Sequence, residues 1–117
     1  MTPTITAREL TTALFDENEL AIVDARDNES YSRGHLLWAA NMRAADAKSA
    51  APILLPRRST RVVVMDNGGD EADNLRGILA SDGWTNVSIL EGGINSWKDA
   101  GYELYSGVSV PSKLFGE

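Results

Sequence analysis

The chain has 117 residues, of which 43% are apolar and 24% are charged, the balance of one ordinary globular domain. Its 17 acidic residues outnumber its 11 basic residues, so the formal charge is −6. Because a negative protein is repelled by phosphate backbones and by anionic lipid, we expect no nucleic-acid partner and no membrane partner.

Cysteine is absent, which excludes disulfides, thiolate metal ligands and every thiol-based mechanism in this chain. The first residues do not combine a basic stretch with an apolar core, and no apolar run approaches the roughly 18–20 residues of a membrane span. The sequence therefore predicts a soluble, cytoplasmic protein.

The first quarter of the chain predicts a strand, a helix and a second strand. Residues 4–6 are strand-like, and Thr6 begins a capping box with Glu9 three residues later, which predicts the start of a helix. Residues 20–24 form a nearly continuous apolar run of strand length. Such a run is typical of a parallel strand that is covered on both faces.

The next segment is less regular. Residues 25–35 are mostly polar and predict a loop with a helical turn, and residues 36–42 predict a short buried return. Residues 43–51 are rich in alanine, but Pro52 and Pro56 interrupt any long helix. We therefore expect an irregular crossover there.

The second half alternates strands and helices. Arginines 57, 58 and 61 precede the apolar strand 62–65 and favour a solvated surface with local ion pairs over an anion site. A helix is predicted over 70–81 with Gly83 as its stop, then a strand over 86–90 and a helix over 94–100 closed by Gly101. This alternation predicts an α/β domain with a mainly parallel sheet and helices on both faces.

Three segments together resemble the rhodanese-like domain, a sulfurtransferase family. They are the run 22–26 with Glu29-Ser30-Tyr31 and Gly34-His35-Leu36, the strand and loop 62–69, and the segment 90–97, Leu-Glu-Gly-Gly-Ile-Asn-Ser-Trp. The resemblance implies a central five-stranded parallel sheet flanked by helices, in a single domain over residues 1–105. Residues 106–117 are then a tail or linker, and its apolar Leu114 and Phe115 suggest that it docks on this domain or on a neighbouring one.

The resemblance also places an active loop directly after the central strand. In active members this loop begins with a cysteine whose thiolate carries the transferred sulfur. The corresponding loop residues here are Asp66, Asn67, Gly68, Gly69, Asp70, Glu71 and Ala72. Asp66 occupies the cysteine position, and Glu71 occupies a position where active members often place a cation. A carboxylate forms no persulfide, and with Asp70 and Asp73 nearby we expect an incoming anion to be repelled.

Two structural explanations of Asp66 remain open. The carboxylate could satisfy the loop amides as an internal anion in place of the thiolate, or the acidic residues could simply cap the start of a helix. A cation site built on Asp66 and the acidic loop is a third hypothesis, but the spacing does not match a calcium loop. We predict no bound metal and no cofactor.

Other residues of the resemblance are predicted to be structural. They are Asp24, Arg26, Gly34, His35, Gly92, Gly93 and Trp97. Trp38 departs from the family pattern because it replaces a glycine, so either the turn is altered or the ring forms a contact surface; a packing role is favoured.

Two functional hypotheses follow. The favoured one is a catalytically inactive binding, regulatory or structural module, whose partner is an unknown protein or a neighbouring rhodanese-like domain of a longer protein. The alternative is a hydrolase-like enzyme that uses Asp66 as nucleophile or metal ligand.

Overall fold

The computed structural model describes residues 3–106, which form one parallel sheet between two layers of helices. The strands are β1 (Thr4–Ile5), β2 (Ala21–Asp24), β3 (Ala39–Asn41), β4 (Val62–Met65) and β5 (Val87–Leu90). The helices are α1 (Ala7–Phe15), α2 (Asn28–Arg33), α3 (Ala47–Leu54), α4 (Glu71–Ser81) and α5 (Gly93–Asp99), with a 3₁₀ turn η1 (Ala44–Asp46) before α3. The predicted α/β fold with a five-stranded parallel sheet is confirmed.

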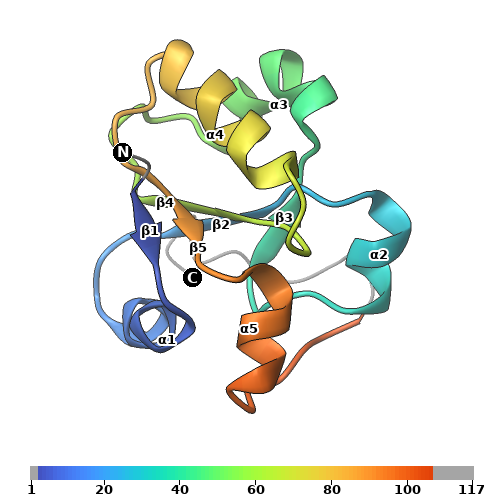
Figure 1. Cartoon of the computed structure of the whole chain (residues 1–117). Helices are drawn as coiled ribbons and strands as arrows, with labels where there is room; N and C mark the ends of the chain where they lie inside the picture. Colours follow the sequence, from blue (N-terminus) through green and yellow to red (C-terminus); the bar gives the residue numbers. More distant parts are fainter. Residues whose placement is uncertain (1–2, 107–117) are drawn as a thin grey trace.

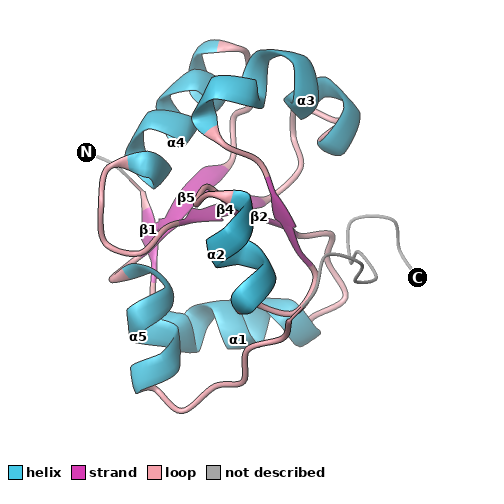
Figure 2. Cartoon of the chain, turned by 90° about the vertical axis from the view of Figure 1, so that its right-hand side faces the viewer, coloured by secondary structure: helices cyan, strands magenta, loops and turns pink. Residues whose placement is uncertain are grey.

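The strand order is β1-β5-β4-β2-β3, so β4 lies at the centre of the sheet. Asp24 at the end of β2 is level with Met65 at the end of β4. Helices α3 and α4 cover one face, and α1, α2 and α5 cover the other (Figure 1). Figure 2 shows the sheet between these layers. No helix within residues 3–106 is long and apolar enough to span a membrane.

The central strands are buried because both of their faces meet a helical layer. In β4, Val62 and Val64 pack into the core beside α3 and α4, whereas Val63 and Met65 pack into the core beside α1 and α5. This alternation explains why the sequence of β4 is apolar at every position rather than at every second one.

Helix α1 begins as predicted. The Thr6 hydroxyl accepts a hydrogen bond from the Glu9 amide at 3.1 Å, and the Glu9 carboxylate accepts one from the Thr6 amide at 2.9 Å. These two bonds satisfy backbone groups that the first turn leaves unpaired. The predicted capping box is therefore confirmed.

The expectation of an irregular crossover after residue 43 is wrong in part. Helix α3 runs through Pro52 and ends at Leu54, two residues before Pro56. Proline donates no amide hydrogen bond, so it costs the helix one bond, but burial of Ala47 and Ala51 against α4 offsets that loss. Packing outweighs local propensity in this helix.

The basic segment before β4 is engaged in local contacts, as predicted. Arg57 pairs with Glu19, and Arg61 pairs with Asp16 through both carboxylate oxygens at 2.9 Å. The Arg58 guanidinium lies 3.8 Å from the centre of the Trp84 ring. All three arginines thus contact neighbouring segments of the chain.

Candidate functional site

The loop between β4 and α4 emerges at the carboxyl end of the central strand. Residues 67–71 are exposed, whereas Asp66 is only 5% exposed and Ala72 is buried at the first turn of α4. In parallel sheets this end of the strands is where ligands commonly bind, because loop and helix N-terminal amides point outward there. The loop therefore stands where a site is expected.

Both oxygens of the Asp66 carboxylate accept hydrogen bonds from the backbone of its own loop. The Gly68 amide donates to Oδ1 at 2.8 Å, and the Ala72 amide donates to Oδ2 at 3.0 Å. Asp70, the residue before α4, makes no side-chain capping bond. Of the two structural explanations, this geometry favours the internal anion, since the side chain that meets the convergent amides is Asp66.

The glycine pair at the start of α5, Gly92 and Gly93, lies against the loop. The Ile94 amide donates to the Asp66 carbonyl oxygen at 2.8 Å. Gly93 has φ +63°, and a Cβ built on it would lie 2.5 Å from that same oxygen. Only glycine fits such a close backbone approach in the left-handed region. The absence of a side chain at Gly93 thus allows the start of α5 to contact the Asp66 backbone.

The acidic residues after Asp66 could form a cation site only by bringing several carboxylates together. Asp73 borders a separate depression on the α3 and α4 side, which Lys48 also lines. Within residues 3–106, no group of three or more His, Asp or Glu side chains is close enough to hold a metal ion. No observation on the described residues favours the cation or hydrolase-like hypothesis, and the expected repulsion of an incoming anion stays a prediction.

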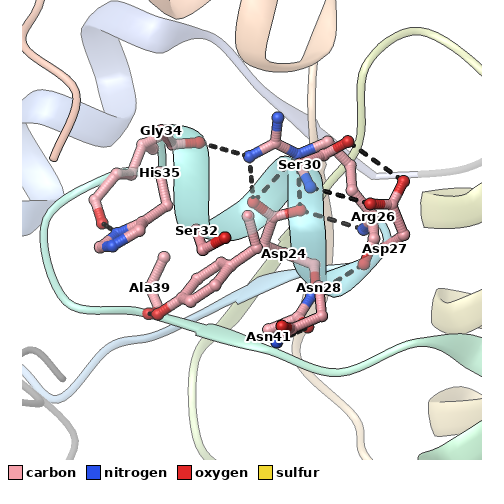
Figure 3. Close-up of polar contacts among 12 residues, drawn as sticks. Asp24, Arg26, Asp27, Asn28, Ser30, Ser32, Gly34, His35, Ala39 and Asn41 are labelled. Atoms are coloured by element: carbon pink, nitrogen blue, oxygen red, sulfur yellow. Dashed lines mark hydrogen bonds and ion pairs between the residues drawn. The ribbon is translucent and has the colours of Figure 1, made fainter. Parts of the chain in front are cut away.

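A second buried carboxylate, Asp24, lies at the end of the neighbouring strand (Figure 3). The Arg26 guanidinium donates to Asp24 Oδ1 through Nε at 2.9 Å and to Oδ2 through Nη2 at 2.6 Å. Nη2 also donates to the Gly34 carbonyl oxygen at 2.6 Å. Asp24, Arg26 and Gly34 thus connect the start of the β2 to α2 loop to the end of α2.

His35 and Tyr31 form the packed turn that follows. Their rings stack with centroids 4.3 Å apart, and the Tyr31 hydroxyl donates to the Ala39 carbonyl oxygen. Burial raises the pKa of Tyr31, and the negative charge of Asp24 raises it further. His35 is fully buried, and its backbone exchanges two hydrogen bonds of 2.8 Å with Tyr105. The surroundings of His35 are those of a core residue.

Two tryptophans pack against the core to different extents. Trp97 on α5 is buried, and its Nε1 donates to the Glu103 carbonyl oxygen at 2.8 Å. Trp38 has φ +64°, the left-handed conformation that favours glycine. This backbone requirement accounts for the glycine of the family pattern. The Trp38 ring is half-buried against the core beside α1, so it combines a packing role with partial exposure.

A polar cleft of about 250 Å³ lies beside the loop, and sequence reasoning missed it. Its wall carries three cationic side chains, Arg26, Arg33 and Lys98, together with the amide side chains of Asn67 and Asn95. These groups come from the loops after β2 and β4, the end of α2, and α5. No local pattern unites positions so far apart in sequence. The lining residues Arg26, Gly34 and Asn67 were singled out from the sequence, but as structural or loop residues and not as parts of one cleft.

Comparisons with known proteins identify a family and several relatives. The family model of the rhodanese-like domain matches residues 6–100. The thiosulfate sulfurtransferase GlpE of Pseudomonas fluorescens is 31% identical over 85 residues, which are 70% of this chain and 73% of that protein. An uncharacterized protein of Buchnera aphidicola is 29% identical over 86 residues, which are 71% of this chain and 58% of that protein.

A solved structure of a thiosulfate sulfurtransferase has a similar fold. The crystal structure of a thiosulfate sulfurtransferase from Pseudomonas aeruginosa superposes with a TM-score of 0.86 and 31% sequence identity, over 91% of this chain but only 20% of that one. The match to the family model covers most of the described strands and helices and includes both buried carboxylates. The chain therefore belongs to the rhodanese-like domain family, and it is a member without cysteine.

Proposed function

We propose that this domain is a non-catalytic member of its family that acts as a binding, regulatory or structural module. The observation that carries the proposal is the Asp66 carboxylate, which is buried and bonded to the amides of Gly68 and Ala72. By resemblance, Asp66 stands where active members place their cysteine. The loop amides that would serve a thiolate are then occupied by a group that transfers no sulfur.

The chemistry of sulfur transfer explains why a carboxylate cannot substitute. A thiolate attacks the outer sulfur of thiosulfate, a sulfur–sulfur bond forms, and sulfite leaves with the electron pair of the bond that breaks. A carboxylate is a far weaker nucleophile towards sulfur and gives no persulfide. A small anion that enters the neighbouring cleft would meet Arg33 and Lys98 but no sulfur nucleophile.

The first experiment is a thiosulfate-to-cyanide transfer assay on the purified chain. We expect no turnover above a matched buffer blank, because the chain contains no thiol. Turnover that copurifies with the chain and disappears in Asp66→Asn would overturn the proposal.

A restoration variant tests whether the loop keeps the family geometry. Asp66→Cys combined with Glu71→Arg should gain weak persulfide formation on incubation with thiosulfate, detected as the added mass of one sulfur atom. Asp70→Cys is the matched control, because Asp70 is exposed in the same loop and has no amide cradle. Equal reactivity of the two cysteines would show that the cradle contributes nothing, and would count against the position assigned to Asp66.

The partner belongs to the same proposal. We infer that the module works beside a neighbouring rhodanese-like domain or another protein in the cytoplasm. Support comes from the P. aeruginosa protein, of which this chain matches only 20%. The mass of the natural polypeptide tests the first option, since a neighbouring domain in the same chain requires a mass well above that of 117 residues.

A further inference from the structure

Two of the exposed large apolar side chains within residues 3–106 meet in one place. Phe15, the last residue of α1, is 71% exposed, and Tyr105 is 39% exposed. Both line a groove of about 150 Å³, which we call the aromatic groove. Its other apolar walls are Leu14, Leu37, Trp97 and Tyr102. The third exposed side chain of this kind, Ile53, is 77% exposed on α3 and lies on the opposite face of the sheet.

The walls of the aromatic groove are positioned by contacts between aromatic rings and by backbone hydrogen bonds. Trp97 and Tyr102 contact each other with ring centroids 4.7 Å apart, and the Trp38 ring approaches Phe15 with centroids 6.5 Å apart. Tyr105 is anchored by its two backbone hydrogen bonds with His35. A cavity of this volume lined by apolar side chains accommodates roughly one aromatic ring. The surface is therefore suited to a single apolar side chain from an extended segment.

The sequence continues from a wall of the groove into a segment of suitable composition. Residues 107–117 follow Ser106, whose neighbour Tyr105 forms a wall of the groove. The segment contains four large apolar residues and two charged ones: Val108, Val110, Lys113, Leu114, Phe115 and Glu117. Phe115 is ten residues beyond Tyr105, so it reaches up to about 33–36 Å from it. A tethered segment is present at the highest effective concentration close to its anchor.

Charge also fits this occupant. Glu103 lines the groove beside the aromatic side chains, and Lys113 precedes Leu114 and Phe115 in the segment. We propose that the aromatic groove is the docking site of this chain's own segment 107–117, with the Phe115 ring seated between Phe15 and Tyr105. Docking there covers the apolar side chains of the groove and of the segment at once.

The experiment uses the absence of cysteine, because one introduced thiol labels a single position. A nitroxide on Gly116→Cys of the full chain, followed by paramagnetic broadening of backbone amide signals, reports where the segment lies. We expect strong broadening at Phe15 and Leu37 and none at Ile53. Leu114→Asp with Phe115→Asp, carrying the same label, should lose the broadening at Phe15, whereas Ser112→Asp should keep it.

Groove variants provide the reciprocal test. Phe15→Ser should abolish the broadening at Leu37, and Ile53→Ser is the matched control because both residues are exposed near the end of a helix. Broadening that is unchanged by the Leu114 and Phe115 substitutions would overturn the proposal, since it would reflect the tether alone. Broadening that appears only between labelled and unlabelled chains in a mixture would also overturn it, by showing that a second copy is the occupant.

Discussion

Asp24 and Asp66 are two buried aspartates at the ends of adjacent strands, and the protein satisfies them in different ways. Asp24 meets an arginine side chain that also bonds to the Gly34 carbonyl oxygen, so one charge pair connects β2 to the end of α2. Asp66 meets only backbone amides of its own loop, those of Gly68 and Ala72. The first carboxylate therefore holds separate segments together, and the second closes a loop on itself.

Asp24 therefore concerns the stability of the domain, whereas Asp66 concerns the chemistry of the loop. Removing one partner of a buried ion pair leaves the other charge uncompensated, which destabilises the whole domain. A carboxylate that fills an amide cradle replaces whatever anion the cradle would otherwise hold. We therefore expect substitutions at Asp24 to lower the stability of the whole domain and substitutions at Asp66 to change mainly the loop.

The largest effect is expected at the ion pair. Asp24→Ala leaves the mostly buried Arg26 guanidinium without its counter-charge, and should lower the free energy of unfolding by about 3–5 kcal/mol. Glu29→Ala removes the exposed pair with Arg33 and should cost about 0.3–0.5 kcal/mol. Urea unfolding measures both. Similar losses in the two variants would contradict the role assigned to Asp24.

The next effect concerns the turn that presses on the Asp66 loop. Gly93→Ala adds a Cβ at φ +63° and 2.5 Å from the Asp66 carbonyl oxygen. It should destabilise by roughly 2–4 kcal/mol through backbone strain and overpacking. Gly77→Ala on α4, where no atom lies within 4 Å of the added carbon, should instead stabilise by about 0.5–1 kcal/mol. Thermal unfolding of the two variants measures both changes in stability. If both variants are stabilised, or both are destabilised, the role assigned to Gly93 is refuted.

A smaller loss is expected at Asp66 itself. Asp66→Ala leaves the Gly68 and Ala72 amides without their acceptor, and should cost about 1–3 kcal/mol. Because these bonds lie within one loop, amide hydrogen exchange should accelerate around residues 66–72 more than around α2. Acceleration spread evenly over both regions would mean that the two aspartates do not differ as described.

The smallest effect is a pH dependence from two exposed caps. Hydrogen bonds from Thr6 and from Ser30 lower the pKa values of Glu9 and Asp27 below 4.5 and 3.8. A lowered folded-state pKa adds stability above the ordinary value, and this stability disappears as the pH falls through the lowered pKa. The double variant Glu9→Gln, Asp27→Asn should therefore lose less stability than the wild type between pH 5 and pH 3, in urea unfolding at each pH. An identical fall in both proteins would show that the caps are not coupled to protonation.

Sequence reasoning identified the fold because its strongest signals are local. The apolar run of β4 and the capping box of α1 each depend on neighbouring residues, and the structure contains both. Helix α3 was underestimated because its stability comes from packing against α4, which a proline rule does not include.

The sequence located the loop after β4, but it did not reveal the polar cleft beside that loop. The position of the loop followed from the resemblance, and the bonds of Asp66 follow from the turn that Gly68 permits at φ +89°. The polar cleft was missed because two of its lining residues, Arg33 and Lys98, belong to different helices and come together only in the folded chain.

The internal-anion account of Asp66 has one direct test in the backbone amide proton shifts of Gly68 and Ala72, compared between the wild type and Asp66→Ala at a single pH. If both amides donate to the Asp66 carboxylate, its removal should move both signals upfield, because each amide loses its hydrogen-bond acceptor. Two signals that keep their wild-type shifts, or a change in only one of them, would contradict the account.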